Sequence, residues 1–155
     1  MKVLAVSASP RKGGNSDVLC DQLLKGASES GNEVEKINLS GLKISPCVAC
    51  YGCRKSGRCV KKDDMERVLD KLIHADVIIL ATPVYFYFMD AQMKIMIDRC
   101  LPRYQEIGNA DRLDFASLIC ILQRFPYLSV LGKKAAVCPK LLPRLRTMND
   151  HQVNV

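Results

Sequence analysis

The sequence lacks several features that would assign it to common protein classes. It has no tryptophan and only two histidines among 155 residues, which argues against a hydrolase triad built on histidine. It contains neither a G-x-G-x-x-G dinucleotide loop nor a Walker A loop. Its longest apolar stretch, residues 77–89, is broken by Thr82 and Pro83. This stretch is shorter than the roughly 18–20 residues that a membrane helix needs, so we expect no membrane partner.

The start of the chain shows no secretion signal, because its apolar run Val3–Val6 is too short for one. We therefore expect a cytoplasmic protein. In that reducing compartment, clustered cysteines indicate metal binding or catalysis rather than disulfides. The net charge of +7 suits anionic ligands. Nucleic acid is not the expected ligand, because no basic helix carries interleaved aromatic residues.

Short apolar runs alternate with helical patterns along the chain. Strands are predicted over residues 2–7, 33–39 and 77–81. One helix is predicted to begin near residue 15, a second near residue 63, and a third to cover residues 89–100. This alternation predicts a single α/β domain over residues 1–155, with a parallel sheet covered by helices on both faces in three layers. Ligands of such sheets bind beyond the carboxyl ends of the strands. The functional loops should therefore follow Ser7 and Ala81.

The first of these loops, SASPRKGGNS over residues 7–16, combines hydroxyls, two cations and two glycines before a helix. A helix N-terminus with glycine backbone and hydroxyl donors can bind an anion, and Arg11 adds a charged fork. We expect Asn15 or Ser16 to cap the helix. The pattern favours a phosphate monoester. The alternative is an ordinary solvated turn.

The second loop, TPVYFYF over residues 82–88, places a proline and four aromatic residues directly after the third strand. Such residues can equally belong to a core. Their position beside the first loop in a parallel sheet favours a binding role instead. Together the two loops would fit a flat, π-rich ligand with a phosphate tail.

Four of the eight cysteines, Cys47, Cys50, Cys53 and Cys59, lie within fourteen residues, with two, two and five residues between successive sulfurs. Structural zinc sites usually pair two knuckles separated by a longer stretch. Compact cysteine runs are typical of a four-iron cluster. Nearby Lys and Arg side chains would partly offset the negative charge of either kind of four-thiolate site. A [4Fe-4S] cluster, zinc and free thiols all remain open. The remaining cysteines read as small buried residues.

Other charged residues point to structural roles. Asp63 and Asp64 are expected to cap a helix, and His74 to bond carbonyls at its end. Asp98 and Arg99 are interpreted as an ion pair or a helix-surface feature.

The segments SASPRKGGNS, the stretch from Asp63 to VIILATPVYF and the run MKIMIDR at residues 93–99 together resemble the flavodoxin-fold NAD(P)H-dependent FMN reductases. The cysteine cluster makes the chain similar to their iron-sulfur flavoprotein branch. The resemblance covers residues 1 to about 100 and implies FMN, a [4Fe-4S] cluster and possible use of NAD(P)H as donor. The residues that it implies for FMN are Ser9, Arg11, Lys12, Gly14, Asn15, Ser16, Pro83, Val84, Tyr85 and Phe86. Those that it implies for the cluster are Cys47, Cys50, Cys53 and Cys59.

The chain departs from this family beyond Arg99. Residues 132–138 are similar to the family's fourth strand, but residues 139–155 form an atypical tail with two prolines and no clear strand. The expected fold is thus flavodoxin-like but truncated at the C-terminus. We expect a homodimer or homotetramer, because the sheet edge would be open and the pocket incomplete. The resemblance to the family implies the same oligomeric states.

The resulting expectation is an FMN-binding oxidoreductase that passes electrons between FMN and a [4Fe-4S] cluster, with a small-molecule or protein donor and acceptor. One alternative is a cluster-free NAD(P)H-dependent FMN or quinone reductase. Another is a non-enzymatic truncated domain with a structural zinc loop.

Overall fold

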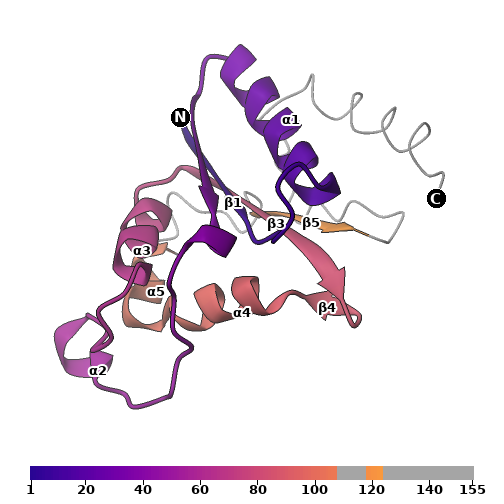
Figure 1. Cartoon of the computed structure of the whole chain (residues 1–155). Coiled ribbons are helices and arrows are strands. Elements are labelled where there is room, and N and C mark those ends of the chain that lie inside the picture. The colour runs from indigo at the N-terminus through magenta and orange to yellow at the C-terminus, as the bar shows by residue number, and fades with distance from the viewer. Residues whose placement is uncertain (108–117, 124–155) are drawn as a thin grey trace.

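The computed structural model describes residues 1–107 and 118–123. Four parallel strands form its sheet in the order β2-β1-β3-β5 (Figure 1). The strands are β1 (Lys2–Ser7), β2 (Glu33–Asn38), β3 (Val77–Tyr85) and β5 (Leu118–Gln123). A fifth, two-residue strand, β4 (Phe88–Met89), pairs antiparallel with the end of β3. With β2 outside β1 and β3 beside it, this order is that of flavodoxin-like folds, and the predicted fold class is confirmed.

Helices cover both faces of the sheet. Figure 1 shows α1 (Asn15–Glu29) on one side, and α3 (Met65–Ile73) and α4 (Ala91–Asp98) on the other. Four short helical segments complete the described part: η1 (Leu39–Gly41), α2 (Cys53–Ser56), η2 (Leu101–Arg103) and α5 (Tyr104–Ile107). None of the helices within the described residues has the length and apolar character needed to cross a membrane.

Alternation along β1 divides the core into two layers. Val3 and Ala5 pack against α1, whereas Leu4 and Val6 pack toward α3 and α4. All four are essentially without solvent exposure. Because successive side chains of a strand point to opposite faces, an all-apolar run requires burial on both sides. The near-continuous apolar composition of β1 and β3 therefore accounts for the three-layer arrangement.

The third strand is longer than the sequence predicts. It continues through Thr82 and Pro83 to Tyr85, and a two-residue turn at Phe86 and Tyr87 leads into β4. The prediction that TPVYFYF is a loop beginning after Ala81 is therefore wrong. Pro83 is tolerated because it pairs with β5 on one side only, at the end of the ladder.

Helix caps differ in detail from the expectation. The N-cap of α1 is Gly14, not Asn15 or Ser16, and Asn15 is the first helical residue. Asp63 accepts the Met65 N–H at 3.1 Å at the start of α3, and the ring Nδ1 of His74 lies 2.7 Å from the Asp70 carbonyl oxygen at its end. The role expected for His74 is thus confirmed. Asp64 is the N-cap residue of α3, but its side chain makes no cap hydrogen bond, and Asp63 makes that bond instead.

Residues 118–123 form the strand β5, for which no element was predicted. The predicted fourth strand at residues 132–138 and the tail at 139–155 lie outside the described residues.

Candidate functional site

The loop between β1 and α1 forms a tight cradle. Ser9 is buried, and its Oγ accepts the Arg11 N–H at 3.3 Å. Gly13 has φ +70°, a left-handed conformation that favours glycine. A Cβ on Gly14 would lie only 3.2 Å from the Arg11 carbonyl oxygen. The path of the loop therefore favours glycine at position 13, and a larger residue at position 14 would require the Arg11 backbone to shift slightly.

The polar side chains of this loop divide into buried and exposed groups. Ser16 is buried, whereas Arg11, Lys12 and Asn15 are exposed. Among the described residues, neither Arg11 nor Lys12 forms a salt bridge with an acidic side chain. Two cations beside a helix N-terminus give the loop a positive electrostatic potential.

The buried carboxylate of Asp17 holds this loop through hydrogen bonds. Asp17, in the first turn of α1, accepts the Gly13 N–H at 2.9 Å and the Ser7 hydroxyl at 3.3 Å. Its other contact is Lys36 of β2, whose Nζ lies 2.7 Å from Asp17 Oδ1. The hydrogen bond from Lys36, followed by that from Gly13, lowers the pKa of Asp17. This pair was not predicted, although an acidic residue in the first turn of a helix indicates an interaction with the helix N-terminus.

The end of β3 lies directly beside this loop. Ser7 is in register with Ala81, and the Ala8 N–H donates to the Ala81 carbonyl at 2.8 Å. Pro83 is buried and Val84 is half-buried, while Tyr85 and Phe86 are exposed. The structure therefore brings the two predicted binding segments to the same edge of the sheet, as the parallel arrangement requires.

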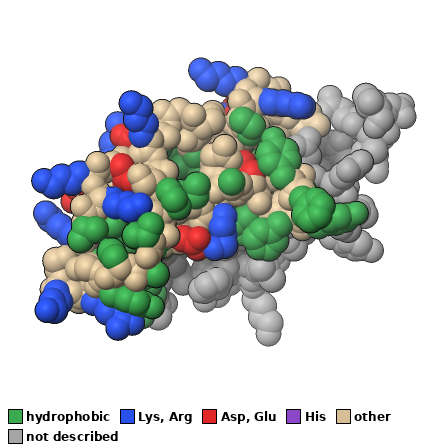
Figure 2. Space-filling model, turned by 60° about the horizontal axis from the view of Figure 1, so that its bottom comes forward, with side chains coloured by type: hydrophobic (Ala, Val, Ile, Leu, Met, Phe, Trp, Pro, Cys, Tyr) green, Lys and Arg blue, Asp and Glu red, His purple; other side chains and the backbone are tan. Residues whose placement is uncertain are grey.

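The turn at the tip of this hairpin is unusual. Phe86 and Tyr87 have φ values of +46° and +67°, and both side chains are almost fully exposed. Two-residue turns of this kind usually contain Asn or Gly, because a Cβ is unfavourable at positive φ. Non-glycine residues in such conformations are concentrated at functional sites. In Figure 2, apolar side chains gather on one face over this hairpin and over the cysteine segment.

Asp90 links the hairpin to α4. Its Oδ1 accepts the Met93 N–H at 2.9 Å, and its own N–H donates to Thr82 Oγ1 at 3.1 Å. The side chain is 1% exposed, and Oδ2 has no hydrogen-bond partner among the described residues. Burial raises the pKa of Asp90. This cap was missed because the expected helix included Met89, although Asp is one of the preferred N-cap residues.

The cysteine loop, residues 46–60, lies at the same carboxyl edge of the sheet, after β2. Its ends are joined by the Lys61 ammonium, which donates to the Pro46 carbonyl at 2.7 Å. Ala49 and Tyr51 have positive φ, and a Cβ on Gly52 would lie 2.7 Å from a methyl group of Val60. Gly52 therefore allows the two arms of the loop to approach closely.

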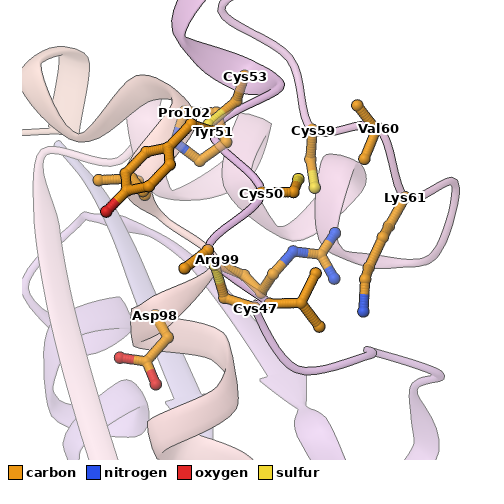
Figure 3. A pocket seen from close by; sticks show the side chains of 13 residues that line it. Cys47, Cys50, Tyr51, Cys53, Cys59, Val60, Lys61, Asp98, Arg99 and Pro102 are labelled. Carbon is orange, nitrogen blue, oxygen red and sulfur yellow. The ribbon is translucent and has the colours of Figure 1, made fainter.

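All four clustered cysteines line one pocket between this loop and the C-terminal end of α4 (Figure 3). Each is a free thiol, and Cys53 and Cys59 are less exposed than Cys47 and Cys50. Within residues 1–107 and 118–123, no three His, Cys, Asp or Glu side chains lie close enough together to hold one metal ion. The four thiols nevertheless line one space, and thiolates are ligands of both zinc and iron-sulfur clusters.

Arg99 lines this pocket, a position that the sequence did not predict. It is buried and donates from Nη1 and Nη2 to the Asp63 carboxylate at 2.8 and 3.0 Å, and from Nη1 to the Ser45 carbonyl at 2.6 Å. The interpretation of Arg99 as a helix-surface feature is wrong, and its ion pair is with Asp63. Asp98 pairs with Lys94 at 2.5 Å. The available signal was that Arg99 follows the buried Met96 by three residues and so shares its face.

Comparison with known proteins assigns these segments to one family. Residues 1–111 match the model of the NADPH-dependent FMN reductase family. An iron-sulfur flavoprotein of Archaeoglobus fulgidus is 44% identical over 102 residues, which are 66% of this chain and 46% of that protein. A solved flavone reductase is 32% identical with a TM-score of 0.54, over 66% of this chain and 31% of its own.

A quinone oxidoreductase of Methanothermobacter marburgensis, described as NAD(P)H-dependent, matches 97% of this chain and 98% of its own with a TM-score of 0.59. At 14% identity, this match concerns the fold alone. The chain spans about half the length of the curated relatives that it matches.

Proposed function

The chain belongs to the family of NADPH-dependent FMN reductases, and from this premise we propose that it is an FMN-binding oxidoreductase whose cysteine loop holds a [4Fe-4S] cluster. The observation that carries the proposal is the junction of β1 and β3. The hydrogen bond from Ala8 to Ala81 puts a cationic, glycine-containing cradle beside an exposed aromatic hairpin. A flavin mononucleotide has the two matching parts, a phosphate and a flat ring system.

The cradle fits the phosphate. In our proposal the Ser9 and Ser16 hydroxyls, the Asn15 amide and the backbone at Gly14 bind phosphate oxygens, and Arg11 and Lys12 neutralise its charge. The Asp17 carboxylate holds the Gly13 N–H and is itself neutralised by Lys36. Asp17 therefore fixes the loop without presenting an uncompensated negative charge to the ligand.

The hairpin fits the ring system. Pro83 and Val84 would contact the isoalloxazine through backbone groups and apolar surface, while Tyr85 and Phe86 stack on it or shield it from water. The exposure of these aromatic side chains leaves their faces available to a ligand. FMN, when bound, accepts a hydride or two electrons and can pass them on singly.

The cysteine pocket fits a metal centre bound by thiolates, and the compact spacing of its cysteines favours an iron-sulfur cluster over zinc. Its donor set consists of four thiols around one space, which suits soft metal ions. Lys61, which also lines the pocket, would offset part of the negative charge of a four-thiolate centre, whereas the charge of Arg99 is balanced by Asp63. α4 connects the two sites, because Asp90 at its start adjoins the hairpin and Arg99 follows its end. Its eight residues span about 12 Å at 1.5 Å per residue.

The remaining parts of the proposal concern the whole protein. We propose a small-molecule or protein donor, NAD(P)H being the candidate that the family suggests, and a small-molecule or protein acceptor. Cytoplasmic location, a homodimer or homotetramer and the absence of a nucleic-acid partner stay predictions.

The decisive experiment is anaerobic purification followed by flavin and metal analysis. We expect FMN absorption and roughly four iron atoms per chain, the content of one [4Fe-4S] cluster. Cys50→Ser should lose the iron and keep FMN. The matched control is Cys100→Ser, because Cys100 bonds the Met96 carbonyl and does not line the pocket.

Other outcomes would replace the proposal. FMN with neither iron nor zinc would identify a cluster-free FMN or quinone reductase. One zinc ion per chain without iron would contradict the cluster. Failure to bind added FMN would contradict both enzyme hypotheses and leave a non-enzymatic domain.

A further inference from the structure

Arg99 is a buried cation, and only some of its N–H groups form hydrogen bonds among the described residues. Its side chain is 2% exposed, at the point where α4 ends. Its two Nη atoms hold the Asp63 carboxylate and the Ser45 carbonyl. Asp63 in turn accepts the Ser45 N–H at 3.0 Å. Arg99 and Asp63 together therefore fasten the residue immediately before the cysteine loop.

The third nitrogen of this guanidinium, Nε, has no hydrogen-bond partner in the part of the chain that the structure describes. Among the described residues, Arg99 Nε is one of two buried side-chain atoms that lack a hydrogen bond. A buried donor without a partner costs free energy comparable to a lost hydrogen bond, so its presence needs an explanation. Figure 3 shows the guanidinium in the cysteine pocket, with the Cys50 and Cys59 sulfurs above it.

The electrostatic surroundings agree with this position. Burial alone would lower the pKa of Arg99, but the Asp63 carboxylate raises it, and the Cys59 sulfur contributes in the same direction.

We propose that Arg99 is a positioning residue for the metal centre, which holds the start of the cysteine loop through Asp63 and Ser45 and directs its free Nε–H toward a cluster sulfur on the Cys59 side. This inference rests on the proposed [4Fe-4S] cluster and adds a role for a residue that is not one of its ligands. Hydrogen bonds to the sulfurs and net charge set the potentials of such clusters. An N–H donor at a cluster sulfur favours the reduced state, which carries one more negative charge. Removal of the Arg99 charge would also leave the Asp63 carboxylate without its counter-ion, which disfavours that state.

The test compares reduction potentials in the full chain, measured by dithionite titration followed by electron paramagnetic resonance. Arg99→Gln removes the charge and the Nε–H, whereas Arg99→Lys keeps the charge and removes the planar fork. The matched control is Arg103→Gln, because Arg103 pairs with Asp70 and Glu106 and does not line the pocket. Iron content and thermal unfolding are measured on every variant.

We expect Arg99→Gln to lower the equilibrium constant for one-electron reduction about tenfold, a shift of about 59 mV to more negative potential. Arg99→Lys should give a smaller shift of the same sign, and Arg103→Gln none. Loss of iron from both Arg99 variants with wild-type unfolding would also support the positioning role. Wild-type potential and iron content in either Arg99 variant would overturn it.

A measurement on the unmutated chain keeps the inference testable if both variants unfold. With ¹⁵N-labelled arginine, the reduced cluster of the wild-type protein should show an electron–nuclear coupling to ¹⁵N. Its absence would overturn the role of Arg99. Absence of iron from the wild-type protein would instead contradict the proposed function, so the two failures are distinguishable.

Discussion

The sheet with its helices and the cysteine loop are built on different physical principles. In the sheet, β1 and β3 bury almost every side chain, and two apolar layers flank them. In the loop, Val48, Tyr51 and Val60 are exposed, and the order comes from single polar bonds such as Lys61 to Pro46. The sheet is therefore stabilised by burial of apolar area, whereas the loop depends on individual hydrogen bonds and on what its thiols bind.

The largest expected difference between these regions concerns folding stability. Leu4→Ala should lower the free energy of unfolding by about 3–5 kcal/mol, because it leaves a cavity in a fully buried layer. Val48→Ala, a truncation in the loop, should change it by less than about 0.5 kcal/mol, as is usual for exposed positions. Urea denaturation measures both. Comparable losses would mean that the loop belongs to the same cooperative core.

The junction of the two regions should show itself in the pH dependence of stability. Burial opposes ionisation of Asp63, but the Arg99 guanidinium and the Ser45 and Met65 N–H groups lower its pKa to about 2. Because this pKa is below the unfolded value, the stabilisation is present above about pH 4 and is lost as the pH falls toward 2. We expect a loss of about 2 kcal/mol in this window.

Denaturation of the apoprotein between pH 5 and pH 2 measures this loss. Asp63→Asn should be less stable at pH 6 and should show a smaller decrease on acidification. Asp98→Asn, which removes an exposed carboxylate, is the control and should retain the wild-type difference. An unchanged decrease in Asp63→Asn would contradict the assignment.

The third expected effect separates ligand binding from stability. Arg11→Ala should weaken FMN binding about tenfold, because it removes a charge-assisted contact to the phosphate. It should leave the affinity for riboflavin, which lacks the phosphate, nearly unchanged. Fluorescence titration of both flavins gives the comparison, with Lys25→Ala as a control on the α1 surface. Equal losses for FMN and riboflavin would contradict the phosphate role.

The smallest expected effect concerns the hairpin turn. Tyr87→Gly should raise the free energy of unfolding by up to about 1 kcal/mol, because it relieves the positive φ of residue 87. Ala at the same position removes the ring and retains the Cβ, and should not give this gain. Denaturation of the two variants in parallel decides whether the backbone or the exposed ring sets the stability of the turn.

The apolar framework was predictable because its signals are local and repeated. The bounds of β1 follow from the run Val3–Val6 between Lys2 and the polar loop, and Met65, Val68 and Leu72 mark α3 by their spacing. The hairpin was missed because Pro83 suggests the end of a strand. A strand position that pairs with a neighbouring strand on one side only, as Pro83 does, tolerates proline. Whether a position is paired on one side or on both depends on the sheet as a whole.

The candidate site was only partly predictable for the same reason. Its loops could be located, since they follow apolar strands at one edge of the sheet. The partners of the buried charges could not, because Asp17 with Lys36 and Asp63 with Arg99 join residues far apart in sequence. Spacing along one chain contains no information on such pairs until the sheet order is known.

Helix α4 sets the distance between the hairpin and the cysteine pocket, which lie at its two ends. Asp90 and Arg99 lie nine positions apart on one hydrogen-bonded rod, so the chain fixes both their separation and their relative direction. Deleting one residue from α4 would shorten this rod by about 1.5 Å and turn one end by about 100° relative to the other. Substitutions in α4 would therefore leave the distance between Asp90 and Arg99 unchanged, whereas insertions and deletions would alter it.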